Sequence, residues 1–424
     1  MKFVLALAVA LLPVSVSALE PVGRHVVDAG DFSDAQSQQW RESEQIATRR
    51  NVASLRSLGF LARPKAQPAA ADLQWPLKPV GGFDQFGYHG VSNFVDHDTR
   101  FPGFVQDYSC GTRSYDLASG YNHAGTDYFL WPFAWLMMDE GQIRIVAAAS
   151  GTIVNKADGN FDRDCAIQSN TNSNPNFVEI LQDDGLYALY LHMRNGSVTQ
   201  LPVGARIAVG DYLGLVGSSG DSSAPHLHFE LRDANGVVVD PRHGQCNAGP
   251  DRWEAFQAYE DPHIDSLSTH SAEPTQIVCG YVGGKNFDDA PHYQSVFAPG
   301  DTFWVFASYR DQRNGEVSDF NIQRPDGSQF TQWNFDLADA NEPKPFYAGT
   351  SFDWQFSLPD DAPTGTWTIT AQFQGQKYER TFTVGSYNYR ANLPAAVRAQ
   401  ARIAADALHC RALHGNPPPP DCKH

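Results

Sequence analysis

The sequence predicts a mainly β protein with more than one domain, and three observations support this. The chain has 424 residues, which is more than one hydrophobic core usually serves, so about two or three domains are expected. Its 35 glycines and 27 prolines punctuate short runs rich in Val, Thr, Tyr and Phe, as is typical of strands and turns. No long helical periodicity interrupts the central runs. We therefore expect an antiparallel β-sheet or sandwich domain followed by an immunoglobulin-like β-sandwich, with helical segments at both ends.

The chain divides at shifts in composition and periodicity. The predicted parts are a signal peptide at 1–18, a leader at 19–72, a first β domain at 73–265, a β-sandwich at 276–388 and a tail at 389–424.

The N-terminal residues predict export. Lys2 gives a positive start, residues 3–12 are apolar, and small residues ending at Ala18 fit a secretory cleavage site. The alternative is an uncleaved membrane anchor, but the apolar run is shorter than the roughly 20 residues that span a bilayer. We expect cleavage after Ala18, no later membrane span, and a periplasmic or fully secreted protein.

The leader predicts one helix. Ser33 is the expected N-cap, and apolar side chains follow at loosely helical spacing as far as about Leu58. Pro64 and Pro68 would end the helix. The leader is interpreted either as a pro-segment that covers the cleft of the next domain until it is removed, or as an amphipathic arm packed on the surface. The sequence favours neither.

The first β domain is predicted from turns between apolar runs. Short motifs ending at Gly185 and Gly236 predict two tight hairpins. Breaks near Gly151 and Gly210 divide two further runs into strand pairs. The expected strands and strand pairs lie at 143–154, 177–181, 186–192, 206–216, 226–232 and 237–240.

A mixed linker at 261–275 is expected to lead into the second β domain. Period-two alternation and Pro/Gly turns there predict an immunoglobulin-type sandwich, a pattern common among extracellular modules. A spacer or docking role is preferred over glycan binding. Its expected strands lie at 303–309, 320–323, 351–357 and 366–373. The tail adds an alanine-rich helix at 394–413 and four consecutive prolines.

Six cysteines, an even number, predict disulfides in an oxidising compartment. Many connectivities are possible, and the simplest is sequential pairing. That pairing gives Cys110–Cys165, Cys246–Cys279 and Cys410–Cys422. A thiolate zinc site is less favoured, because the chain has no Cys-x-x-Cys.

The net charge of −17 and the pI near 5.1 oppose non-specific binding to nucleic acid and to anionic membranes. They also oppose targeting to an anionic cell wall by bulk charge attraction. Affinity for such a polymer would require specific contacts.

Three short motifs bring histidines together with carboxylates. His123 and Asp127 lie four apart in a loop-like context, and His192 ends a predicted strand. His226 and His228 lie two apart on another predicted strand, so both leave the same face of its sheet. Taken singly, each could be a surface histidine or a core histidine held by hydrogen bonds.

Together these residues can form a catalytic zinc site. Such a site takes three protein ligands and leaves a fourth position for water. His123, Asp127 and His228 can supply the ligands for one Zn²⁺ per chain, with His192 and His226 as unligated imidazoles beside the metal. The sequence contains no His-Glu-x-x-His, nucleophile elbow or phosphate loop.

The order of these motifs resembles that of the lysostaphin/LytM-type zinc endopeptidases. The pieces are His-x-x-x-Asp at 123–127, Tyr-x-His at 190–192, and a Gly-Ser-Ser-Gly loop at 217–220 leading into His-Leu-His-Phe-Glu at 226–230. The resemblance covers roughly 90–241, a little over a third of the chain. It implies an antiparallel β core, the duplicated hybrid motif fold, and cleavage of peptide bonds in bacterial cell-wall peptidoglycan.

The resemblance also implies the roles of the histidines. It makes His228 the ligand and His226 its catalytic partner, with His192 as the second catalytic histidine. Which of His192 and His226 is the general base is left open, and Glu230 is interpreted as structural. The aromatic insertion at 128–139 departs from a minimal version of the fold. Its Trp131 and Trp135 either wall the cleft or fill a small core, and the core interpretation is preferred.

The predicted function is that of a secreted zinc metalloendopeptidase acting on a peptidoglycan stem peptide or cross-bridge. The alternatives are an enzyme that degrades extracellular proteins and a non-catalytic wall-binding or amidase-activating protein of the same fold. Because all five site residues are present, the non-catalytic alternative is disfavoured. The bond that is cut and the oligomeric state are not predicted.

Overall fold

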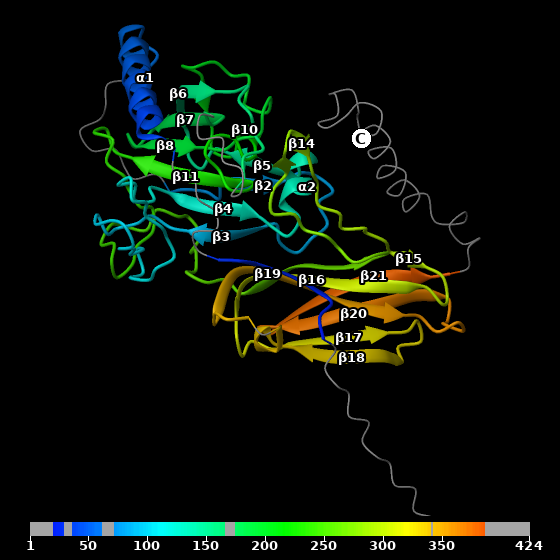
Figure 1. The fold of residues 1–424 in the computed structure, drawn as a ribbon. Helices are drawn as coiled ribbons and strands as arrows, with labels where there is room; N and C mark the ends of the chain where they lie inside the picture. Colours follow the sequence, from blue (N-terminus) through cyan, green and yellow to red (C-terminus); the bar gives the residue numbers. More distant parts are fainter. Residues whose placement is uncertain (1–19, 29–35, 62–71, 166–173, 341, 386–424) are drawn as a thin grey trace, which may run out of the picture.

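The computed structural model describes residues 20–28, 36–61, 72–165, 174–340 and 342–385. Two β-rich parts lie one above the other in Figure 1, with helix α1 (Gln38–Ser57) against the side of the upper part. Strands make up 40% of the described residues and helices 9%, which confirms the predicted mainly β class. The predicted signal peptide and tail lie outside the described residues. No described helix is long and apolar enough to span a membrane.

The first β domain is built on a seven-stranded sheet whose neighbouring strands are all antiparallel. In spatial order its strands are β3 (His89–Asn93), β4 (Thr126–Leu130), β11 (His226–Arg232), β8 (Tyr187–Tyr190), β7 (Phe177–Gln182), β6 (Gly151–Ala157) and β9 (Arg206–Ile207). Alternation along β11 sends Leu227, Phe229 and Leu231 into the hydrophobic core. The polar residues of β11 therefore face the other side of the sheet.

A smaller sheet completes this domain. It contains β10 (Tyr212–Leu215), β5 (Ile143–Val146) and β2 (Leu77–Pro79), and its Ile145 and Leu213 share the core with Ile153 and Ile180 of the larger sheet. The insertion after β4 forms a short helix, α2 (Ala134–Asp139).

Most strands predicted in this domain are present, and the two predicted strand pairs are divided near the expected glycines, but the members of each pair lie in different sheets. The run at 143–154 is split between β5 and β6, which belong to different sheets, and the run at 206–216 is split between β9 and β10 in the same way. The hairpin of β7 and β8 is confirmed, with Gly185 in the left-handed region at φ 92°. After β11, the predicted strand at 237–240 forms only a bridge between Arg232 and Val238.

The second β domain is a sandwich. A four-stranded sheet holds β1 (Gly23–Val27), β19 (Phe346–Ser357), β16 (Thr302–Arg313) and β12 (His263–His270). A five-stranded sheet holds β15 (Val296–Phe297), β21 (Gln376–Val384), β20 (Gly365–Phe373), β17 (Ser318–Gln323) and β18 (Gln329–Phe335). Large aromatic side chains, including Trp333, Trp354 and Trp367, fill the space between the sheets.

Two strands of the sandwich lie where the sequence predicted other structure. Strand β12 occupies most of the expected linker at 261–275, because Ile264 and Leu267 are completely buried and the strand pairs with β16. Strand β1 comes from the leader and pairs with β19. The Ser-rich sequence of β12 has a weak strand signal, so its strand conformation depends on pairing with β16.

Helix α1 begins later than predicted within the described chain. Its N-cap is Ser37, whose Oγ accepts a hydrogen bond from the Trp40 amide at 3.2 Å. The expected N-cap, Ser33, lies outside the described residues, as do Pro64 and Pro68. The helix ends at Ser57, one residue before the predicted end.

A hairpin of β13 (Tyr281–Val282) and β14 (Lys285–Asn286) leaves the sandwich after β12 and reaches α2 of the first domain (Figure 1). The Nε of Arg163 donates to the Gly280 carbonyl at 2.9 Å. Asp289 accepts hydrogen bonds from the amides of Trp135 and Leu136 at the start of α2. This loop therefore holds the two domains together.

The cysteine pairing corrects the sequential prediction. Cys110 bonds to Cys246, and Cys165 bonds to Cys279. The first bond joins two loops of the first domain, where the Cys246 amide also donates to the Tyr108 carbonyl at 2.8 Å. The second bond joins the first domain to the loop that carries β13 and β14. Cys410 and Cys422 lie outside the described residues.

Candidate metal centre

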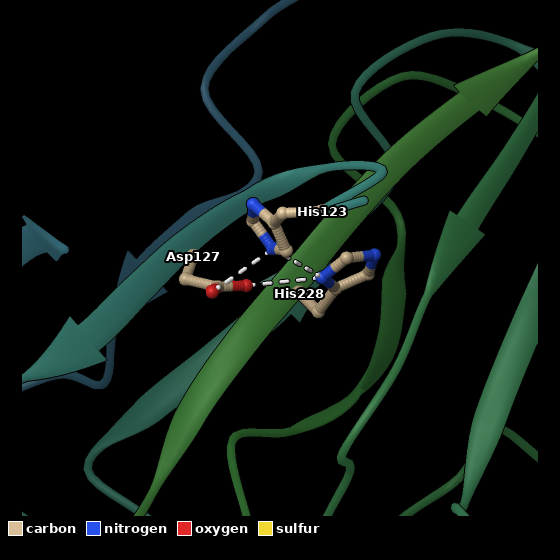
Figure 2. Close-up of side chains that lie close together, drawn as sticks. All are labelled: His123, Asp127 and His228. Atoms are coloured by element: carbon tan, nitrogen blue, oxygen red, sulfur yellow. Dashed lines mark hydrogen bonds and ion pairs between the residues drawn. The ribbon is translucent and has the colours of Figure 1, made fainter. Parts of the chain in front are cut away.

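Three side chains predicted as zinc ligands meet at one point of the seven-stranded sheet (Figure 2). Nε2 of His123 lies 3.0 Å from one carboxylate oxygen of Asp127. Nδ1 of His228 lies 3.0 Å from the other oxygen and 3.3 Å from Nε2 of His123. All three side chains are almost completely buried.

These separations fit a tetrahedral metal. Ligand atoms about 2.0–2.1 Å from a tetrahedral zinc lie roughly 3.3 Å from one another. The donors are two imidazoles and one carboxylate, a set that suits zinc and leaves one corner of the tetrahedron without a protein ligand. His123, Asp127 and His228 therefore lie close enough together to hold one Zn²⁺.

Strand register places two of these residues side by side. Asp127 of β4 and His228 of β11 are direct cross-strand partners, so their side chains leave the same face of the sheet. On the other side of β4, Asp127 is opposite Asn93 of β3, whose Nδ2 donates to the carboxylate at 3.1 Å. This amide orients the carboxylate.

Hydrogen bonds also orient the two imidazoles. Nδ1 of His123 donates to the Phe94 carbonyl at 2.7 Å, which leaves the lone pair of Nε2 facing the cluster. Nε2 of His228 lies 3.5 Å from the Glu230 carboxylate, which leaves the lone pair of Nδ1 facing the cluster. A partner on the far ring nitrogen is the usual arrangement for a metal-binding histidine.

His192 and His226 lie beside the cluster. Nδ1 of His192 donates to the Ser219 carbonyl at 2.7 Å, and Nδ1 of His226 donates to the Ala224 carbonyl at 2.7 Å. The two rings are 4.4 Å apart, and the His192 ring lies 6.2 Å from that of His228. His192 follows β8 with φ at 64°, an uncommon conformation for a residue with a side chain and one that recurs at functional sites.

The comparison with known protein families agrees with this geometry. Residues 133–241 match the model of Peptidase family M23.

This chain carries a peptidase family M23 domain.

The first β domain, in which the match lies, is called the M23 domain below. The matched stretch includes His192, His226 and His228, whereas His123 and Asp127 precede its first residue. The assignment of these last two therefore depends on the distances within the cluster.

Three solved structures show a distant likeness. A crystal structure of a candidate peptidase M23 from Pseudomonas aeruginosa is 16% identical, with a TM-score of 0.24 over 47% of this chain and 60% of that chain. The alkylpurine DNA glycosylase AlkC of Pseudomonas fluorescens, bound to DNA containing an abasic site analog, is 12% identical, with a TM-score of 0.19 over 30% of this chain and 31% of that chain. The C-terminal domain of wzt is 15% identical, with a TM-score of 0.19 over 30% of this chain and 77% of that chain. This chain thus spans less than two thirds of the length of the first structure.

A buried ionic network extends from the M23 domain's cluster to helix α1. Arg232 donates to both oxygens of Glu230, at 2.6 and 3.0 Å, and to Glu44 of α1 at 2.7 Å. Burial alone would raise the pKa of Glu230, but the Arg232 guanidinium and His228 hold it at about 2. Glu230 is therefore an ionised partner for His228 at neutral pH.

A second carboxyl in this network has its pKa shifted in the opposite direction. Burial, followed by the neighbouring Glu44, raises the pKa of Glu179 well above its usual value. Thr48 of α1 donates a hydrogen bond to Glu179, and Asn155 of β6 donates to Thr48 at 3.0 Å. Helix α1 thus makes specific polar contacts with the strands beneath it.

The aromatic insertion fills a core rather than walling a cleft. Trp135 is 1% exposed within the main core of the M23 domain. Trp131 packs with Phe129, Val27 and Ala348 where the M23 domain meets the sandwich. This agrees with the core interpretation preferred from the sequence.

Sequence reasoning missed several residues that support the cluster. Asn93 lies far from the motifs in the chain, and only the register of β3 with β4 brings it to Asp127. Glu44 acts through Arg232, which has no motif of its own. Glu230 was predicted to share the strand face of His228, two residues before it, but was interpreted as structural rather than as a partner of that imidazole.

Proposed function

We propose that this protein is a zinc metalloendopeptidase that hydrolyses peptide bonds of bacterial cell-wall peptidoglycan. The observation that supports this most strongly is the close approach of His123, Asp127 and His228 next to two further imidazoles. A purely structural zinc site uses four protein ligands and needs no such imidazoles beside it. The peptidase family M23 match supports the same class of chemistry.

The proposed chemistry divides between the ligands and the two neighbouring histidines. Zinc, when bound, polarises the scissile carbonyl and makes water acidic near neutral pH. One of His192 and His226 accepts the proton of the attacking water, and the other donates a hydrogen bond to the oxyanion that develops on the carbonyl. In both rings Nδ1 donates to a backbone carbonyl, so we assign these two roles to Nε2.

Access to the cluster supports the proposal that the protein is made in a latent form. All five site side chains are at most 1% exposed, so a peptide cannot reach them without movement of covering residues. Described residues of the leader lie around the site: Gln36 donates to the Asp221 carbonyl at 3.0 Å, and Arg41 stacks over Tyr121 at 4.7 Å. We therefore prefer the pro-segment interpretation of the leader.

Mass spectrometry of purified peptidoglycan incubated with the protein, with and without a zinc chelator, tests the proposal. We expect new cross-link fragments that disappear with the chelator and return when zinc is restored. His228→Ala should produce none, whereas His243→Ala, at an exposed histidine, should match the unaltered protein. Intact muropeptides from zinc-loaded protein freed of its leader would move the substrate to extracellular proteins or favour a non-catalytic role.

A further inference from the structure

A cavity of about 310 Å³ lies where the M23 domain meets the sandwich, away from the zinc cluster. The M23 domain contributes Trp75, His89 of β3, and Arg242, while β16 of the sandwich contributes Arg310 and Asp311. His89 and Val91 of β3 both line the cavity. The cavity has no residue in common with the zinc cluster. Because both domains contribute lining residues, the cavity forms only where they meet.

Most charges around this cavity are already paired. Arg310 donates to Asp261 at 2.6 Å and also forms an ion pair with Asp265. Asp311 forms an ion pair with the buried Arg113. Two guanidiniums thus face three carboxylates, and each of these groups already has a partner of opposite charge.

Arg242 is the exception. Arg242 is only 3% exposed; Asp240 and the hydroxyls of Tyr108 and Tyr128 lie near enough to act on its guanidinium, but no carboxylate of the described residues forms a close ion pair with it. Nη1 makes one long hydrogen bond, of 3.5 Å, to the Gln257 carbonyl, and Nε has no hydrogen-bond partner within the described chain. A buried, unpaired charge is costly, so a structure that keeps one points to an anion supplied from outside.

Aromatic rings surround this cation. The guanidinium lies 4.9 Å from the ring of Phe94 and 5.9 Å from that of Trp253, contacts that stabilise a cation only in part. Trp75 and Phe256 also line the cavity, and Phe256 is 85% exposed, so the cavity reaches the surface. The buried Nδ1 of His89 has no partner among the described residues and adds one polar contact.

We propose that this cavity is a binding site for a small organic carboxylate that carries a flat or apolar group. The carboxylate pairs with Arg242, and the apolar group lies between Trp75 and Phe256. Guanidinium–carboxylate pairs in a site shielded from water are among the strongest polar contacts in proteins. Because the site joins both domains, its occupant also strengthens their contact.

Calorimetric titration with benzoate and with benzamide, its neutral counterpart, tests the proposal. We expect benzoate to bind at least tenfold more tightly than benzamide. Arg242→Gln should weaken benzoate binding at least tenfold, and Phe256→Ala should weaken it several-fold. Arg324→Gln is the matched control, because this guanidinium also stacks on aromatic rings, those of Phe330 and Trp367, but outside the cavity.

Two further comparisons make the outcome decisive. Carboxylates also bind zinc, so each titration is done on zinc-loaded and on chelator-treated protein, and equal affinities are expected. If Arg242→Gln does not fold, as judged by circular dichroism, benzoate binding by two other variants tests the proposal. These are Phe256→Ala, at an exposed residue, and Arg242→Lys, which keeps the charge. Equal binding of benzoate and benzamide, binding that depends on zinc, or benzoate affinity unchanged in Phe256→Ala would each overturn the proposal.

Discussion

At the scale of single residues, position distinguishes the three candidate zinc ligands from the two histidines that we propose as catalytic. The His192 ring lies 6.2 Å from that of His228, but His192 belongs to none of the three close contacts among the candidate ligands. We expect His192→Ala to lower turnover by about a hundredfold or more while zinc remains bound. Metal content by mass spectrometry, measured on the same sample as activity, checks this. Loss of zinc from the variant would show that its assigned role is wrong.

Glu230 provides a second prediction at this scale. Because its ionised carboxylate faces Nε2 of His228, we expect Glu230→Gln to weaken zinc binding by about tenfold to a hundredfold. Competition against a chromogenic chelator measures the affinity directly. Asp233→Asn is a suitable control, because Asp233 lies in an exposed turn and accepts hydrogen bonds from the amides of Asn235 and Val237. Unchanged zinc affinity in Glu230→Gln would leave Glu230 with only a structural role.

The residues of the site could be anticipated from the sequence to different degrees. His226 and His228 lie two apart on a strand, so their common face follows from strand geometry alone. The meeting of His123 with His228 depends on the pairing of β4 with β11, which the motif order suggested but no local pattern encodes. Glu44 could not be anticipated, because its partner Arg232 lies 188 residues away in the chain.

At the scale of elements, truncated chains can distinguish the contribution of α1 from that of β1. A chain beginning at residue 62 lacks both, while a chain beginning at residue 28 lacks only β1. If the leader is a pro-segment, we expect the shorter chain to turn over substrate at least tenfold faster than the full protein, and the chain from residue 28 to remain slow. Equal rates of peptidoglycan cleavage in all three would instead make α1 a surface arm.

The contact of β1 with β19 predicts a dependence on pH. Burial and the nearby Glu273 raise the pKa of Asp353 on β19 to about 7, above the value near 3.9 expected in the unfolded chain. Between these values the folded state holds a proton that the unfolded state releases, so stability falls as pH rises from about 4 to about 7. We expect Asp353→Asn to stabilise the protein by on the order of 1 kcal/mol at pH 8 and by little at pH 4. Thermal melts of both proteins across this range measure the difference, and parallel curves would contradict it.

Elements with a clear local sequence signal could be predicted, whereas strands that form only through pairing with a distant strand could not. The β7–β8 hairpin was predictable because Gly185 takes a left-handed conformation that other residues avoid. Strand β12 was read as a linker, since its polar residues Ser266, Ser268 and Thr269 show little alternation without the strand beside it. Strand β1 lies more than 300 residues from its partner β19, and no local signal reports such a pairing.

At the scale of the whole molecule, the two disulfides have different roles. Cys110–Cys246 joins two loops of the M23 domain, and Cys165–Cys279 links that domain to the loop at the junction with the sandwich. Sequential pairing was the simplest prediction because it closes the shortest loops, but the fold joins cysteines 136 and 114 residues apart. The loop that carries Cys279 also supplies Asp289 to the start of α2 and the Gly280 carbonyl to Arg163. The Cys165–Cys279 bond therefore reinforces an interface that polar contacts already define.

This arrangement predicts different consequences for the two bonds. Replacing Cys165 and Cys279 by Ser should lower stability by about 2–5 kcal/mol, since a long loop is released in the unfolded chain. It should also free the sandwich from the M23 domain and so weaken benzoate binding in the cavity they share. Replacing Cys110 and Cys246 should destabilise the M23 domain without loosening that junction, because both lie in its own loops. Denaturant melts and benzoate titrations of the two double variants test this contrast, and equal loss of benzoate affinity in both would show that the junction does not depend on the Cys165–Cys279 bond.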